Sequence, residues 1–112
     1  MKKVKHVKYS GGKLQWRLLP LAALEEILRG LMFGAQKYGA DNWMVGCKWN
    51  LYYDAAMRHL TAWYKGSDRD EESGLSHLAH AGCCILFLLT FSLFKKYKKF
   101  DNRTKRDYEK LV

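Results

Sequence analysis

Three of the four histidines lie in one short stretch of the chain, on either side of a run of acidic residues. His59 precedes the acidic run, and His77 and His80 follow it. Imidazole can transfer a proton near neutral pH, bind a metal ion or donate to a phosphate. The acidic residues between the histidines are Asp68, Asp70, Glu71 and Glu72. Helix capping explains one or two acids, whereas hard carboxylate oxygens in this number favour a divalent cation.

A zinc site built from the neighbouring cysteine is not favoured. His77, His80 and Cys84 are spaced i, i+3 and i+7, which places them on one face of a helix. Two histidines and one cysteine at this spacing lack a recognised zinc pattern and a fourth ligand. The two histidines therefore remain candidates for metal ligands, phosphate donors or a general acid and base. The structural alternative is a pair of histidines that belong to the core.

Two other sets of residues could face a ligand. Glu26, Gly30, Phe33 and Lys37 superpose as one stripe at helical spacing, which indicates either a ligand-facing surface or an ordinary solvated one. Trp43 and Trp49 lie in a predicted connector, where they either seal the end of a bundle or supply an aromatic ring that stacks on a base.

Three helices are predicted to position these residues. Apolar spacing predicts the first helix from residue 21, after Pro20, to about residue 38, where Gly39 ends it. A second helix is predicted over residues 50–64 and a third from near Gly74 to about Phe94. The polar turn between them contains Asp70 and Ser73, either of which can cap the third helix. The chain is therefore predicted to be all-α, a small bundle of three to four helices.

Net charge is unevenly distributed along the 112 residues, which have the length of one domain. Residues 1–17 contain six basic side chains and no acidic one, and the region 95–112 is also basic, whereas the middle is slightly acidic. This predicts a basic arm (residues 1–12), a helical domain (residues 13–94) and a basic tail (residues 95–112). A nucleic-acid-binding domain would more often spread its basic residues over a folded face, so nucleic acid is an unlikely partner.

Neither a secretory signal nor a membrane span is predicted. The basic N-terminal residues are not followed by an apolar segment, and the three cysteines fit a reduced, cytoplasmic compartment. The uncharged run from Leu78 to Phe94 is shorter than the roughly 20 apolar residues of a spanning helix. It begins with histidines and a glycine, which favours a core helix or a dimer interface.

Several ordered motifs resemble one family. The segments are WRLLPLAALEEILRGLMFGAQKYGADNW, DAAMRHLTAWYKG and DEESGLSHLAHA, with the shared pattern LLP, FGAxKYG, NW, RH, WxxG and SGLxHLxHA. This pattern over about residues 13–94 resembles the phage dATP/dGTP diphosphohydrolase N-terminal-domain family, which is grouped with MazG-like nucleotide pyrophosphohydrolases. The resemblance implies a fold like that of the all-α NTP pyrophosphatases and a homo-oligomer, either a dimer or a tetramer. It also implies metal-dependent conversion of a purine deoxynucleoside triphosphate into the monophosphate and pyrophosphate.

The family pattern falls on a defined set of residues. They are Glu26, Lys37, Asn42, Trp43, Arg58, His59, Asp70, Ser73, His77 and His80. The chain departs from MazG-like enzymes, which have EExxE on one helix and ExxD on a later one. Here Glu25 and Glu26 lack the third glutamate, and HLAH stands where ExxD is expected.

The resemblance implies that residues 13–94 form a nucleotide-binding domain. Together with the differences from MazG-like enzymes, it leaves two possible functions. In the first, Mg²⁺ or Mn²⁺ would be held by Glu26, Asp70 and Glu72. The triphosphate and the base would be bound by Lys37, Asn42, Trp43, Trp49, Arg58 and Ser73. A proton would be relayed by His59, His77 or His80. In the second, the same pocket would sequester a host nucleotide immune signal, such as a cyclic nucleotide or an ADP-ribose derivative, without turnover.

Overall fold

The computed structural model describes residues 4–104, so residues 1–3 of the predicted arm and 105–112 of the predicted tail lie outside the described residues. Three α-helices form a small all-α bundle, as predicted. They are α1 (Leu21–Tyr38), α2 (Trp49–Tyr64) and α3 (His77–Leu93). Three short 3-10 helices accompany them: η1 (Trp16–Leu18), η2 (Asn42–Val45) and η3 (Lys95–Phe100). No strand is present in residues 4–104.

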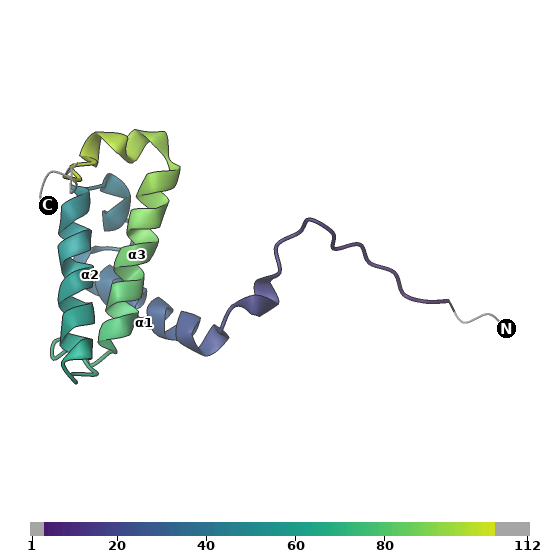
Figure 1. Ribbon diagram of the computed structural model, residues 1–112, viewed down its shortest axis with the longest axis horizontal. Coiled ribbons are helices and arrows are strands. Elements are labelled where there is room, and N and C mark those ends of the chain that lie inside the picture. Colours follow the sequence, from purple (N-terminus) through teal and green to yellow (C-terminus); the bar gives the residue numbers. More distant parts are fainter. Residues whose placement is uncertain (1–3, 105–112) are drawn as a thin grey trace, which may run out of the picture.

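The helices α2 and α3 lie side by side, and α1 lies against α3 behind this pair (Figure 1). Two glycines permit the close approach of α1 and α3. A Cβ on Gly30 would lie 2.7 Å from the Cys83 Sγ, and a Cβ on Gly82 would lie 2.7 Å from the Ile27 side chain. Burial raises the pKa of the Cys83 thiol to about 11, and this thiol donates to the Ile27 carbonyl oxygen at 3.3 Å.

A cluster of aromatic side chains closes the end of the α2–α3 pair that lies away from the connection between these two helices. Phe91 is completely buried, and Trp49 and Tyr97 are nearly so. The Phe91 and Tyr97 rings are 4.7 Å apart, and the Tyr97 hydroxyl donates to the Met44 carbonyl oxygen at 2.8 Å. Residues 95–100, at the start of the predicted basic tail, form η3, which packs onto the core through Tyr97 and Phe100.

The start of α3 differs from the prediction. Gly39 ends α1 as predicted, with its N–H donating to the Ala35 carbonyl oxygen, and α2 begins one residue earlier than expected. The third helix, however, begins at His77 and not near Gly74. Its cap is Ser76, whose side chain accepts from the Leu78 N–H at 3.1 Å.

The residues before α3 form a closed loop (residues 67–76), which explains the later helix start. The Asp70 N–H donates to the Leu75 carbonyl oxygen, and the Gly74 N–H donates back to the Asp70 carbonyl oxygen, each at 2.8 Å. Gly74 has a φ of 72°, which an L side chain rarely adopts. Within residues 4–104, no helix combines the length and apolar character needed to cross a membrane.

Candidate functional site

A cleft of about 550 Å³ lies between α1 and the α2–α3 pair. Each helix contributes side chains to it. Those from α1 include Gly30, Phe33 and Lys37, those from α2 are Tyr52, Ala55 and His59, and those from α3 include His80, Cys84 and Phe87. Asp70 and Glu72 of the loop also line it. The cleft therefore brings together predicted site residues from five separate segments, since Asn42 and Trp43 of η2 also line it.

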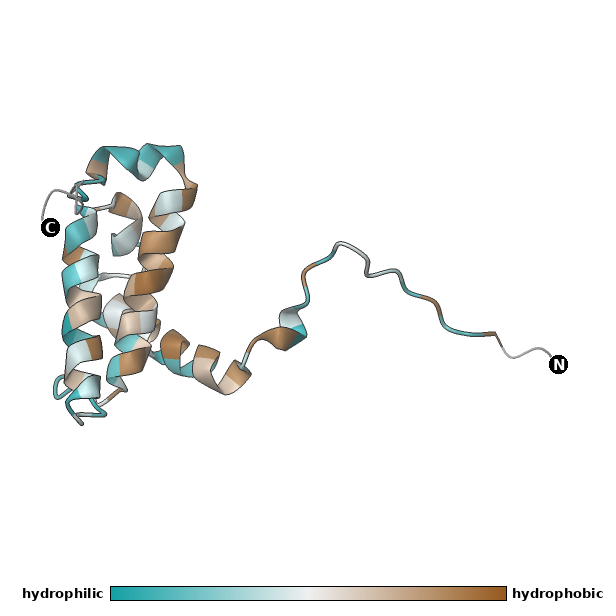
Figure 2. Ribbon diagram, in the orientation of Figure 1, coloured by the Kyte–Doolittle hydropathy of each residue, from teal (hydrophilic) through white to brown (hydrophobic). Residues whose placement is uncertain are grey.

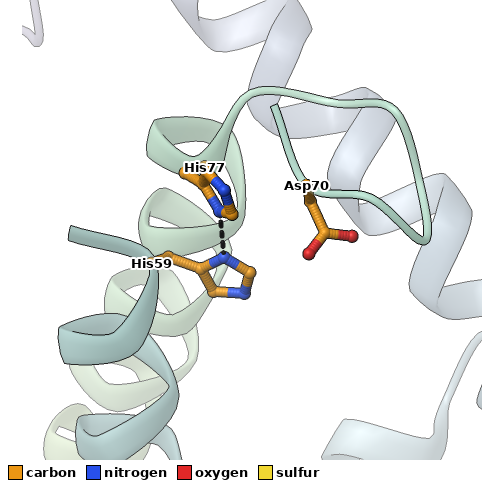
Figure 3. A group of neighbouring side chains, drawn as sticks. All are labelled: His59, Asp70 and His77. Atoms are coloured by element: carbon orange, nitrogen blue, oxygen red, sulfur yellow. Dashed lines mark hydrogen bonds between the residues drawn. The ribbon is translucent and has the colours of Figure 1, made fainter. Parts of the chain in front are cut away.

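Three imidazole rings meet at the loop end of the cleft. The Nδ1 atoms of His59 and His77 are 2.9 Å apart and share a hydrogen bond, so the rings of α2 and α3 face each other (Figure 3). The His80 ring stacks on the His59 ring, with centroids 4.8 Å apart and an interplanar angle of 16°. His59 and His80 line the cleft, whereas His77 is buried behind His59.

Serines of the loop orient two of these rings. The Ser67 Oγ lies 3.1 Å from the His77 Nε2, and the Ser73 Oγ lies 2.6 Å from the His80 Nε2. The edge of the Phe33 ring also meets the His80 ring, at 6.0 Å between centroids. Ser73 was predicted as a site residue, but Ser67 was not. The only signal for Ser67 in the sequence was its polar character just before the acidic run.

The electrostatics of the cluster favour a neutral His59 beside a charged Asp70. Burial and the neighbouring His80 lower the pKa of His59 below its ordinary value, so its imidazole is neutral at pH 7. Partial burial by itself would raise the pKa of Asp70. The hydrogen bonds from Ser73 and the nearby His80 outweigh this effect and lower it. The Ser73 N–H donates to the Asp70 Oδ2 at 3.0 Å.

The three carboxylates predicted to bind metal are not gathered at one point. The Glu26 carboxylate pairs with Arg29 at 2.6 Å, and the Glu72 carboxylate pairs with Lys37 at 2.5 Å. Only Asp70 lies next to the histidines. Among the residues that the structure describes, one group of at least three potential ligands has its ligand atoms within 4.8 Å of one another: His59, Asp70 and His77.

The predicted nucleotide-binding residues fall into two groups. The first group lies in the cleft or directly beside it and consists of Lys37, Asn42, Trp43 and Ser73. Trp49 instead belongs to the buried core, 5% exposed, under the Arg103 guanidinium. Arg58 is exposed on another face of α2, in a shallow groove with Met57 and Lys65.

The end of the cleft away from the histidines is aromatic. The Trp43 ring stacks on the Phe87 ring, with centroids 5.5 Å apart at 21°, and the Tyr52 ring lies 5.1 Å from Phe87. Phe87 is two turns from His80 along α3, or roughly 10 Å. Tyr52 and Phe87 were not predicted as site residues. The apolar side chains of α2 form no clear stripe, and the apolar run of α3 does not show which side chains face the cleft.

The family described as "dATP/dGTP diphosphohydrolase, N-terminal" matches residues 3–103. The dATP/dGTP diphosphohydrolase of Salmonella phage PMBT28 is 39% identical over 97 residues, which are 87% of this chain and 32% of that protein. The chain thus spans about a third of the length of this relative. No solved structure matches the chain.

Proposed function

The chain belongs to the dATP/dGTP diphosphohydrolase N-terminal family, and we propose that its cleft binds a purine deoxynucleoside triphosphate and hydrolyses it to the monophosphate and pyrophosphate. The observation that carries this proposal is the difference in chemical character between the two ends of the cleft. One end is an aromatic wall, and the other is a cluster of imidazoles and an aspartate, roughly 10 Å away along α3. A nucleotide shows the same difference between its ends, with an aromatic base at one end and phosphates at the other.

The base is proposed to stack at the Trp43 end. Trp43 is half-buried and already stacks on Phe87, so the ring is held in place before a ligand arrives. A base that stacks on an aromatic side chain gains about 1–3 kcal/mol. Asn42 lies beside Trp43 on the cleft wall and offers an amide that can both donate to and accept from a base edge.

The phosphates are proposed to lie between Lys37 and the histidines. The hydrogen bond with Glu72 raises the pKa of Lys37, so its ammonium is charged at neutral pH. This exposed pair lies at the rim of the cleft, where the ammonium can turn from the carboxylate to a phosphate oxygen at little cost. His80 lines the cleft beside Ser73, and its imidazole is suited to accept a proton from an attacking water.

A divalent metal ion, which the family resemblance implies, would when bound neutralise phosphate charge and lower the pKa of a bound water. Asp70 is the one predicted ligand that the cleft places beside the histidines. Its carboxylate is held by the Ser73 N–H, so it offers an oriented negative charge at the phosphate end.

The test is direct turnover by this chain. We expect incubation with dGTP or dATP and Mn²⁺ or Mg²⁺ to release the monophosphate and pyrophosphate in equal amounts, with EDTA stopping the reaction. Products can be separated by anion-exchange chromatography. Release of inorganic phosphate alone would contradict the proposed bond cleavage. Recovery of intact nucleotide from a stoichiometric complex after heating would support sequestration, the alternative function, and overturn hydrolysis.

We also propose that the chain forms a homo-oligomer through the outer face of α3. Ile85, Leu89 and Leu93 follow one another at four-residue spacing, and each is more than half exposed. Figure 2 shows apolar residues along much of α3. Large exposed apolar patches often mark protein–protein interfaces, and a second copy of the chain would cover this row of side chains.

The Leu89→Glu variant should therefore lower the oligomer order. We expect light scattering to give the mass of a smaller species for this variant than for the wild-type chain at the same concentration, because a carboxylate cannot be buried at an apolar interface without a partner. Met57→Glu on the exposed face of α2 is the matched control and should leave the mass unchanged. A wild-type chain that is monomeric at all concentrations would contradict the proposal.

A further inference from the structure

Two imidazoles and one carboxylate lie close together, although they come from three elements of the fold. His59 comes from α2, Asp70 from the loop and His77 from the first residue of α3. Their potential ligand atoms all lie within 4.8 Å of one another, and Figure 3 shows the Asp70 carboxylate beside the facing pair of rings. Such convergence of residues separated by up to 18 positions is not a consequence of helical spacing.

The distance between the two imidazole nitrogens matches that between neighbouring ligands of one metal ion. With a metal–nitrogen bond of about 2.1 Å, two ligands are roughly 3.0 Å apart at a right angle and roughly 3.4 Å apart at a tetrahedral angle. The Nδ1 atoms of His59 and His77 are 2.9 Å apart. Without an ion, one of these two atoms donates its proton to the other. An ion bound to both would replace this proton, and both rings would turn to direct their nitrogens at it.

Hydrogen bonds with two serines of the loop orient two of these three side chains. The Ser67 Oγ contacts the Nε2 of His77, so the opposite ring nitrogen, Nδ1, is directed at His59. The Ser73 N–H holds the Oδ2 of Asp70. Metal-binding histidines and carboxylates are usually oriented by hydrogen bonds of this kind.

The chemistry of the three side chains selects a class of ion. Mg²⁺ prefers an all-oxygen environment and retains several waters, whereas imidazole suits the divalent transition metals. We infer that His59, Asp70 and His77 bind one divalent transition metal ion, such as Mn²⁺, Co²⁺ or Zn²⁺, in preference to Mg²⁺. This set differs from the carboxylates Glu26, Asp70 and Glu72 expected from the sequence. His59 and Asp70 line the cleft, so the remaining coordination positions face it.

The role of this ion at the phosphates rests on the proposed function, but its binding does not. The test therefore uses the full chain without nucleotide, stripped with EDTA and dialysed. Titration with CoCl₂ or MnCl₂ should show one ion bound per chain, by calorimetry and by the visible absorption of Co²⁺ or the electron paramagnetic resonance of Mn²⁺. MgCl₂ should bind at least about tenfold more weakly.

Variants identify the ligands. His59→Ala and Asp70→Asn should each weaken Co²⁺ binding by at least roughly 10–100-fold and change its absorption spectrum, while the circular dichroism spectrum stays helical. Asp70→Asn is the gentler change, because the amide oxygen can still accept from the Ser73 N–H. His6→Ala is the matched control, since His6 is exposed in the N-terminal segment, and it should bind Co²⁺ like the wild type.

Two results would overturn this inference: equal affinity for Mg²⁺ and Co²⁺, or wild-type Co²⁺ binding by both His59→Ala and Asp70→Asn. Its failure can be distinguished from failure of the proposed function. Stoichiometric Co²⁺ binding without any release of pyrophosphate supports the site and removes the hydrolase function. Pyrophosphate release by a chain that binds no transition metal supports the function and removes the site.

Discussion

Replacing His80 with alanine should lower kcat/KM for dGTP by roughly 10²–10⁴-fold, the usual contribution of a general acid or base, and should leave the helical fold near native. The His80 imidazole lines the cleft, stacks on His59 and lies 2.6 Å from the Ser73 Oγ. Its loss removes a proton-exchanging group from the proposed phosphate end. The measurement is steady-state hydrolysis of dGTP beside a circular dichroism spectrum of the same preparation.

The His80→Asn variant separates proton exchange from positioning. An asparagine amide can still hydrogen-bond with Ser73, but it does not titrate. If His80 exchanges protons, His80→Asn should be about as inactive as His80→Ala. Near-normal hydrolysis by His80→Asn would show that His80 only positions its neighbours. A gross loss of helical signal in His80→Ala would show that it is a structural residue.

The largest effect on stability is expected for Phe91→Ala, at about 3–5 kcal/mol in the free energy of unfolding. Phe91 is completely buried and contacts the rings of Trp43, Tyr52 and Tyr97. Truncation would leave a cavity among rings that cannot all move inward. Because small domains are stable by only about 5–15 kcal/mol, this variant should unfold at a much lower urea concentration.

Tyr53→Ala is the control for this stability measurement. Tyr53 is also an aromatic residue within a helix, but its side chain is 58% exposed, so its truncation should change the unfolding free energy little. Equal destabilisation by both variants would show that the aromatic cluster does not form the core. Because Trp43 contacts Phe91, a folded Phe91→Ala chain should also bind dGTP more weakly.

The helices were predictable because their signals are local. Apolar spacing and the stop at Gly39 depend only on neighbouring residues, and both were confirmed for α1. The start of α3 was wrong because the loop before it satisfies its own backbone groups, among them the Asp70 N–H and the Leu75 carbonyl oxygen. The hydrogen bonds of a loop do not recur at a regular spacing, so a sequence pattern cannot reveal them.

The site was only partly predictable because it depends on contacts between elements. The spacing of His77 and His80 showed that they share a helix face, but not that His59 of α2 would meet them. Likewise, the count of acids could not show that Glu72 pairs with Lys37 while Asp70 turns toward the histidines. The burial of Trp49 and Tyr97 in one cluster joins residues 48 positions apart.

The glycine contacts between α1 and α3 have a consequence for what a movement of α1 would change. The three clustered histidines and the serines that orient two of them belong to α2, the loop and α3, whereas α1 contributes Phe33 and Lys37 to the opposite wall. Where Gly30 of α1 meets Cys83 of α3, only α3 contributes a side chain to the contact. We therefore expect a small tilt of α1 about this seam to change mainly its contacts across the cleft, which are those of Phe33 with His80 and of Lys37 with Glu72.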